Sequence, residues 1–116
     1  MTTASKADEI SLPQSPDWVE RVKEKAFNYM SQYGNCTQCI LAAFMEELGI
    51  EDPMVIRSAG AMQGGMLSSL TCGVHTAAIM VLGLMMGRER LEQGHDGMFP
   101  IVIPAQELMR RINSRL

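Results

Sequence analysis

The sequence lacks three features, and each absence argues against a broad class of protein. It has no basic excess: 10 Lys and Arg against 13 Asp and Glu give a net charge of -3, which argues against a nucleic-acid binder. No segment reaches the roughly 18 consecutive apolar residues of a membrane span, so we expect no membrane insertion. Only three cysteines and no apolar leader segment are present, so we expect a cytoplasmic protein without a disulfide framework.

What is present is the composition of one folded domain. Hydrophobic residues make up 47% and charged residues 20% of the 116 residues, which is ordinary for a globular chain. A chain of this length buries a core without the help of disulfides or metal. Residues 1–15 are polar, so we predict a flexible N-terminal arm there and a single helical domain over 16–116.

Apolar residues recur at steps of three or four along most of that domain, which predicts helices. The predicted helices are 18–33, 36–48, 52–62, 73–86 and 105–116. The segment 73–86 is apolar nearly all round, so we place it at the centre. A loop rich in small residues (AMQGGMLSSLTCG) precedes it, and a polar connector (RERLEQGHDG) and an extended segment (MFPIVIP) follow it. The expected fold is all-α, a compact bundle of four or five helices around a central apolar helix.

Several residues are of the types that begin or end helices. Ser15 or Asp17 can cap the first helix, and Asn35 can cap the second, with Gln38 placed for a capping box. Pro53 suits the first turn of the third helix. The glycines that follow predicted helices, and that we expect to end them, are Gly34, Gly49 and Gly87.

Two of the three cysteines, Cys36 and Cys39, stand three positions apart at a predicted helix start, and so on one face. The partial positive charge of a helix N-terminus favours the thiolate, which attacks disulfides and binds metals. The spacing suits a dithiol couple, although the best-known redox setting of CxxC is a βαβ fold. Two small residues on a buried stripe explain the pattern equally well. Ile40 follows Cys39 where a c-type haem site needs His, so that attachment is excluded.

Cys72 also stands at a predicted helix start, and His75 follows it by three residues. An imidazole near the sulfur would favour the thiolate, which makes a minimal nucleophile arrangement. The alternative is a core histidine bonded to a backbone carbonyl. Cys36, Cys39, Cys72 and His75 also form a possible ligand set for zinc or an iron–sulfur centre, provided that all four side chains converge.

The stretches NCTQCILAAFMEELGIED and AGAMQGGMLSSLTCGVHTAAIMVLGLMMGRE resemble a family named for its cysteine pattern, C-GCAxxG-C-C, whose members are described as redox-active. Three elements carry the resemblance: an N-C-x-Q helix start, a Gly-rich loop, and a helix that opens with C-G and runs into leucine-glycine-leucine. The matching positions are Asn35, Cys36, Gln38, Gly64, Gly65, Cys72, Gly73 and residues 80–84. The similarity covers residues 18–87 and continues more weakly through the last helix. It implies functional cysteines, and an association of relatives with split-Soret cytochromes implies a haem or iron–sulfur alternative.

The sequence also departs from that family pattern. Val74 and Ala77 replace an alanine and a glycine of the third element, and Cys39 is an addition. The family's two later cysteines follow its final helix, and the sequence to Leu116 does not contain them. A four-cysteine cluster within one chain is therefore not expected, and a degenerate, inactive family member is an alternative.

The leading hypothesis is a thiol-based redox site in which helix N-termini bring Cys36 and Cys72 into one pocket. One of the two would be the attacking thiol, and Cys39 a resolving partner. His75 would favour the thiolate or shuttle a proton. The loop at Gly64–Gly65 would give access to the site or contact a cofactor. The thiol chemistry needs no cofactor, and its natural counterpart is a redox partner protein.

Two other hypotheses stay open, and the sequence does not decide whether the protein is an enzyme. One is a binding protein for zinc, an iron–sulfur centre or haem at the four-ligand set. The other is a non-catalytic interaction protein, in which MFPIVIP and the methionine-rich helices form a homodimer interface. We expect a homodimer under each hypothesis, because a nearly all-apolar helix needs more cover than four short helices give.

Overall fold

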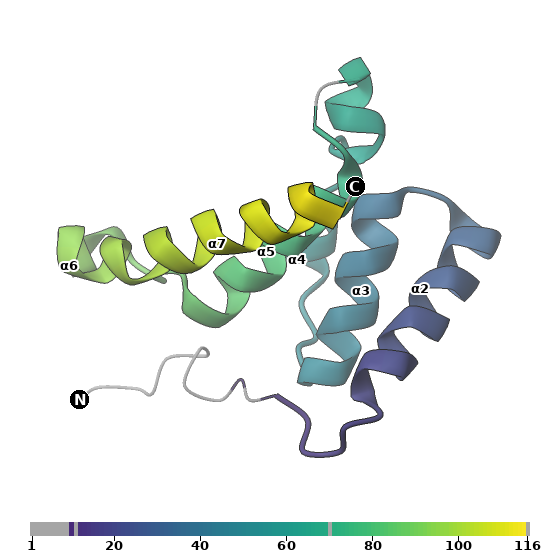
Figure 1. The fold of residues 1–116 in the computed structure, drawn as a ribbon, viewed down its shortest axis with the longest axis horizontal. Helices are drawn as coiled ribbons and strands as arrows, with labels where there is room; N and C mark the ends of the chain where they lie inside the picture. The colour runs from purple at the N-terminus through teal and green to yellow at the C-terminus, as the bar shows by residue number, and fades with distance from the viewer. Residues whose placement is uncertain (1–9, 11, 70, 116) are drawn as a thin grey trace.

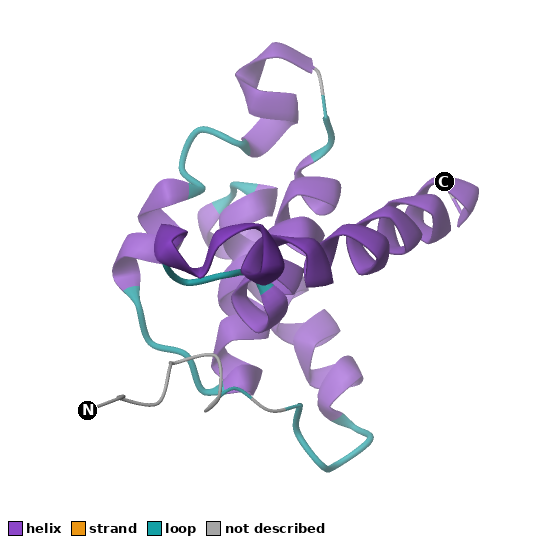
Figure 2. Ribbon diagram, turned by 90° about the vertical axis from the view of Figure 1, so that its left-hand side faces the viewer, coloured by secondary structure: helices purple, strands orange, loops and turns teal. Residues whose placement is uncertain are grey.

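The computed structural model describes residue 10, residues 12–69 and residues 71–115. Within these ranges every regular element is helical (Figures 1 and 2), so the predicted all-α fold is confirmed. None of the described helices is long and apolar enough to cross a membrane. The elements are α2 (Trp18–Tyr33), α3 (Cys36–Leu48), α4 (Pro53–Ser58), η1 (Gly65–Ser69), α5 (Gly73–Met86), η2 (Leu91–Gln93), α6 (Gly94–Met98), η3 (Phe99–Ile101) and α7 (Val102–Arg115).

Most helix ends lie where the local sequence signals predict them. Gly49 adopts the left-handed conformation, with φ 73° and ψ 28°, and ends α3. The side chain of Asp52 accepts the Met54 backbone N–H at 3.0 Å, and Pro53 is the first residue of α4. Two ends differ: α4 stops at Ser58 and does not reach residue 62, and α7 begins at Val102, three residues before the predicted start.

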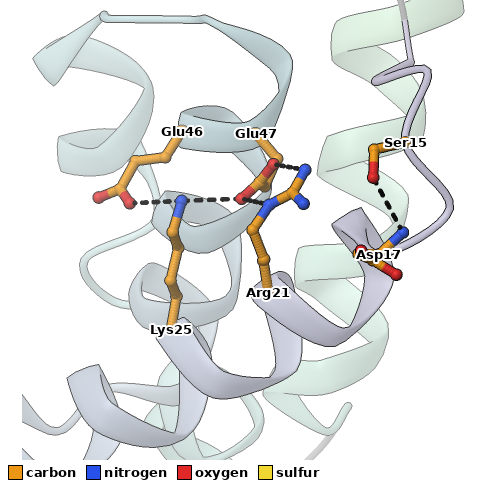
Figure 3. Close-up of polar contacts among 6 residues, drawn as sticks. All are labelled: Ser15, Asp17, Arg21, Lys25, Glu46 and Glu47. Carbon is orange, nitrogen blue, oxygen red and sulfur yellow. Dashed lines mark hydrogen bonds and ion pairs between the residues drawn. The ribbon is translucent and has the colours of Figure 1, made fainter.

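Charged side chains join α2 to α3 (Figure 3). Arg21 donates from Nε and Nη2 to the two carboxylate oxygens of Glu47, at 2.9 and 3.0 Å. Lys25 Nζ lies 2.9 Å from Glu47 and 3.4 Å from Glu46. The Glu47 side chain is only 8% exposed, and its hydrogen bonds from Arg21 and then Lys25 lower its pKa to about 2. These contacts set the position of α2 along α3.

The hydrophobic core is built around α3, which packs against α2 and α5. Buried core residues are Leu41, Met45, Leu48, Ala59 and Val81. Because α2 and α5 pack on two sides of α3, the buried residues of α3 are not confined to the single stripe predicted for it. The apolar helix α5, predicted at the centre, contacts both α3 and α7, and it shares the central place with α3.

The stretch predicted as a polar connector and an extended MFPIVIP segment is mostly helical, so the extended prediction was wrong. The elements α6, η3 and α7 follow one another without a break. Pro100 lies in η3 and Pro104 lies in the first turn of α7. Proline is tolerated in a first turn because its missing N–H would have no partner there. The two prolines therefore belong to helix starts.

The predicted loop before α5 contains one distorted turn, η1, which stands out from the bundle in both views (Figures 1 and 2). Gly64, Gly65, Met66 and Leu67 all have φ between 57° and 63°. A left-handed conformation costs about 1–2 kcal/mol for a residue with a side chain. The turn also leaves the side chains of Met66 and Leu67 exposed.

Most of the predicted N-terminal arm, residues 1–9 and 11, lies outside the described residues. The same holds for Leu116, the last apolar residue of the predicted final helix. Ile10 is described, and its side chain packs against the core cluster. The division into an arm and one domain stays a prediction.

Candidate functional site

The start of α3 is held by its predicted cap, Asn35. Its side-chain oxygen accepts the Gln38 backbone N–H at 3.0 Å, and its amide nitrogen donates to the Gly60 carbonyl at 3.2 Å. The Gln38 side chain does not close the predicted capping box, because it donates to the Ile56 carbonyl at 3.0 Å. Both side chains therefore anchor α3 on the end of α4, with Cys36 as the first helical residue.

Cys36 lies directly against the start of α5. A Cβ added to Gly73 would lie 2.1 Å from Cys36 Sγ and 2.7 Å from Thr37 Oγ1, so the sulfur occupies space that any side chain at position 73 would need. Cys72 precedes Gly73 and is the N-cap of α5, with no side-chain capping hydrogen bond. Because consecutive Cα atoms are about 3.8 Å apart, the Cys72 backbone lies within one residue of this contact. Both thiols are free, Cys36 half-buried and Cys72 exposed.

Two threonines fix the two helix starts against each other. Thr37 is fully buried, and its Oγ1 donates to the Gly73 carbonyl at 3.4 Å and lies 3.2 Å from Thr76 Oγ1. Thr76 Oγ1 donates to the same carbonyl at 3.0 Å. A buried hydroxyl without a partner costs about 1–3 kcal/mol, so this set of contacts favours one alignment of α3 with α5. Sequence reasoning missed both threonines, although each is a hydroxyl residue at the start of a largely apolar helix.

Cys39 lies in a different environment from Cys36. Its thiol is buried and donates to the Gly34 carbonyl at 2.9 Å. Burial, and then the nearby Cys36, raise the pKa of the Cys39 thiol. The residue lines a cavity of about 420 Å³ that also includes Tyr29 and Tyr33 of α2. The structure therefore gives Cys39 a weakly reactive setting.

The ring of His75 reaches α7. Its backbone N–H donates to the Cys72 carbonyl at 3.0 Å, while its Nε2 lies 3.1 Å from Asn113 Oδ1. Its Nδ1 is buried and has no hydrogen-bond partner among the described residues. No hydrogen bond in the described part of the chain joins this imidazole to the Cys72 thiol. Asn113 could not have been predicted, because the contact joins helices 38 positions apart.

The predicted access loop lies in the segment before α5. Gly64 is exposed and has room for a side chain, whereas Gly65 is buried. The positive φ of both residues shows why glycine suits this left-handed turn. The structure thus supplies a conformational reason for the two glycines, and their contact with a cofactor stays a prediction.

The four-ligand set does not converge in one chain. Across residue 10, 12–69 and 71–115, no group of three or more His, Cys, Asp or Glu side chains is arranged to hold a metal ion. Cys36 faces Gly73, Cys39 donates to Gly34, and His75 contacts Asn113. The fold therefore brings the Cys36 side chain beside Gly73, the residue after Cys72, whereas the side chains of Cys39 and His75 contact other residues.

One family model matches residues 34–115, and its description reads "Putative redox-active protein (C_GCAxxG_C_C)". The match begins at Gly34, includes both helix starts described above and extends through α7. No curated protein and no solved structure matches the chain.

Proposed function

Because the chain belongs to the C-GCAxxG-C-C family, which is described as "Putative redox-active protein", we propose that Cys36 and Cys72 form a reversible dithiol/disulfide couple. The observation that supports this most directly is the contact of Cys36 Sγ with the backbone position next to Cys72. Each of the two cysteines stands at the start of a helix, Cys36 as the first residue of α3 and Cys72 as the N-cap of α5.

The exposed thiol of Cys72 makes the first attack in this proposal, and its natural counterpart is a disulfide of a partner protein. The Cys72 thiolate attacks one partner sulfur, forms a mixed disulfide and releases the other partner sulfur as a thiolate. The Cys36 thiolate then attacks Cys72 Sγ, which closes the Cys36–Cys72 disulfide and releases the second partner thiolate. Two electrons pass to the partner, and the chain loses its two thiol protons. The reverse sequence oxidises the partner.

The remaining predicted site residues take secondary roles in this proposal. Cys39 is the alternative resolving thiol, although its burial and raised pKa favour Cys36 in that role. His75 follows Cys72 by one helical turn and is the nearest candidate in sequence for a proton shuttle. A cytoplasmic location, where such couples exchange with other thiols, is part of the same proposal.

The test is the mass of the intact protein after thiol alkylation across a graded redox buffer, starting from protein purified without air. We expect two alkylation sites to disappear together. The ratio of oxidised to reduced protein should change tenfold for each change of about 30 mV in the buffer potential, as for a two-electron couple. The loss should persist in Cys39→Ser and vanish in Cys36→Ser and in Cys72→Ser. If Cys39→Ser abolishes it instead, Cys39 belongs to the couple, and whichever of Cys36→Ser and Cys72→Ser also abolishes it identifies the second cysteine. Three thiols that stay modifiable throughout would end the redox proposal, and thiols protected until a chelator is added would point to metal.

We also propose that the chain forms a homodimer through the segment 91–103. Leu91, Phe99 and Ile103 are exposed large hydrophobic residues within this segment. Ile103 is 70% exposed, and α6 and the start of α7 lie at the end of the molecule opposite α2 (Figure 1). Several exposed apolar side chains in one stretch are typical of a protein–protein contact.

A further inference from the structure

The hydroxyl of Thr37 joins the residue after one cysteine of the proposed couple to the residue after the other. Thr37 follows Cys36 in α3, and its Oγ1 donates to the carbonyl of Gly73, the residue after Cys72, at 3.4 Å. The same Oγ1 lies 3.2 Å from Thr76 Oγ1, which donates to the Gly73 carbonyl at 3.0 Å. These contacts link the two helix starts that contain the cysteines.

This hydroxyl has no access to water that could replace its partners. Thr37 is 0% exposed, and its position in α3 fixes where the hydroxyl lies. A Cβ added to Gly73 would lie 2.7 Å from Thr37 Oγ1 and 2.1 Å from Cys36 Sγ, so the hydroxyl and the sulfur share one small space beside α5. A shift of α3 along α5 would leave a buried hydroxyl unpaired, which is strongly unfavourable. The contacts of Thr37 therefore also hold Cys36 in place.

A disulfide forms only within a narrow range of geometry. The two Cα atoms must lie about 4.4–6.8 Å apart, and the torsion about the S–S bond must be near 90°. A disulfide between Cys36 and Cys72 therefore needs one alignment of the two helix starts. Where other contacts already hold that alignment in the reduced chain, closing the disulfide does not have to impose it, and the oxidised form is favoured.

We infer that Thr37 is a positioning residue that shifts the Cys36–Cys72 couple toward the disulfide by holding Cys36 against the start of α5. The inference rests on the couple proposed above and adds a group that sets its redox midpoint. The hydroxyl acts through the Gly73 carbonyl, and it exchanges neither an electron nor a proton in the reaction.

The experiment measures the redox midpoint of the full chain by alkylation mass across the graded redox buffer. Thr37→Val removes the hydroxyl and keeps the branched shape of the side chain. It should lower the ratio of disulfide to dithiol about fivefold at a given buffer potential, the value of one hydrogen bond. This change corresponds to a midpoint higher by about 20 mV. Thr37→Ser keeps the hydroxyl and should restore the midpoint of the unmodified chain.

Thr71→Val is the matched control. Thr71 directly precedes Cys72, and its hydroxyl makes no hydrogen bond within the part of the chain that the structure describes. This variant should have the midpoint of the unmodified chain. Should Thr37→Val fail to fold, Thr37→Ala removes the same hydroxyl without placing a methyl group in its position, and it should shift the midpoint in the same direction.

An unchanged midpoint in the folded variant without the hydroxyl would overturn the inference, because a purely structural threonine stabilises the reduced and oxidised chains alike. An equal shift in Thr37→Ser or in Thr71→Val would overturn it as well. If the unmodified chain forms no disulfide between Cys36 and Cys72 in any buffer, the proposed function falls together with this inference. A couple whose midpoint does not depend on Thr37 removes this inference alone.

Discussion

At the scale of single residues, the absence of a side chain at Gly73 decides how close α3 and α5 approach. The sulfur of Cys36 and the hydroxyl of Thr37 fill the space where a Cβ would stand. The same helix contains a second glycine, Gly83, whose Cβ would meet nothing within 4 Å. One helix thus offers a glycine that the packing requires and one that it does not.

This difference makes a matched pair of substitutions. Gly73→Ala should lower the free energy of unfolding by about 1–3 kcal/mol, because Cys36 or the helix start must move. It should also reduce the fraction of Cys36–Cys72 disulfide in a fixed redox buffer. Chemical denaturation and alkylation mass measure the two effects.

Gly83→Ala is the control for helix propensity. It should raise the free energy of unfolding by up to about 0.5–1 kcal/mol, because alanine favours the helix and the site has room. If Gly73→Ala were as stable as Gly83→Ala, the close contact between Cys36 and the start of α5 would not exist in solution.

At the scale of elements, charged side chains form one of the contacts that join α2 to α3. The carboxylate of Glu47 accepts hydrogen bonds from Arg21 and Lys25, and the side chain is nearly buried between the two helices. Removing one partner from such a site leaves buried charge uncompensated, which is strongly destabilising. The tyrosine of the same cluster, Tyr29, donates to Glu46, and that hydrogen bond raises the pKa of Tyr29.

The depressed pKa of Glu47 predicts a pH dependence of stability. Its pKa falls from an ordinary 4.5 to about 2 in the folded chain. Its contribution to the free energy of unfolding is therefore complete above pH 4.5 and is lost as the pH falls through about 2. Glu47→Gln should unfold at a lower temperature than the unmodified chain at neutral pH. The difference between the two should shrink as the pH falls from 4.5 to 2, as measured by thermal denaturation.

Glu20→Gln provides the control for this prediction. Glu20 pairs with Lys23 at 3.2 Å within α2, and both side chains are largely exposed. Exposed pairs of this kind contribute little, so the variant should follow the unmodified chain at every pH. A constant difference between Glu47→Gln and the unmodified chain across this range would show that the carboxylate charge has no part in holding α2.

At the scale of the whole molecule, apolar surface remains on the segment 91–103. Its exposed hydrophobic residues include Phe99 and Ile103. A second copy of the chain is the partner that we propose for them.

The dimer proposal predicts a specific disruption. Ile103→Glu should convert a dimer into a monomer in analytical ultracentrifugation, because a carboxylate in an apolar contact loses its hydration. Phe27→Glu is the control, since Phe27 is 73% exposed on α2 at the opposite end of the molecule (Figure 1). A monomeric unmodified chain, or a dimer that Phe27→Glu alone disrupts, would contradict an interface at 91–103.

The sequence by itself determined the features that depend on near neighbours along the chain. The all-α fold, the bounds of α5, the cap at Asn35 and the stop at Gly49 all follow from contacts within about four residues. The prolines of MFPIVIP misled the prediction, because the same residue suits an extended segment and a helix start. Whether such a proline lies in an extended segment or at a helix start depends on whether the flanking residues form helical turns.

The tertiary structure alone decided which distant groups meet. Thr37 contacts the Gly73 carbonyl and Thr76 across more than 35 positions, and His75 contacts Asn113 across 38. The periodicity of a helix reveals which face is apolar, but it does not reveal which helix covers that face or at what register. The packing of α3 between α2 and α5 therefore decides that Cys36 and Cys39 lie in different environments. It also brings Cys36 close to the start of α5.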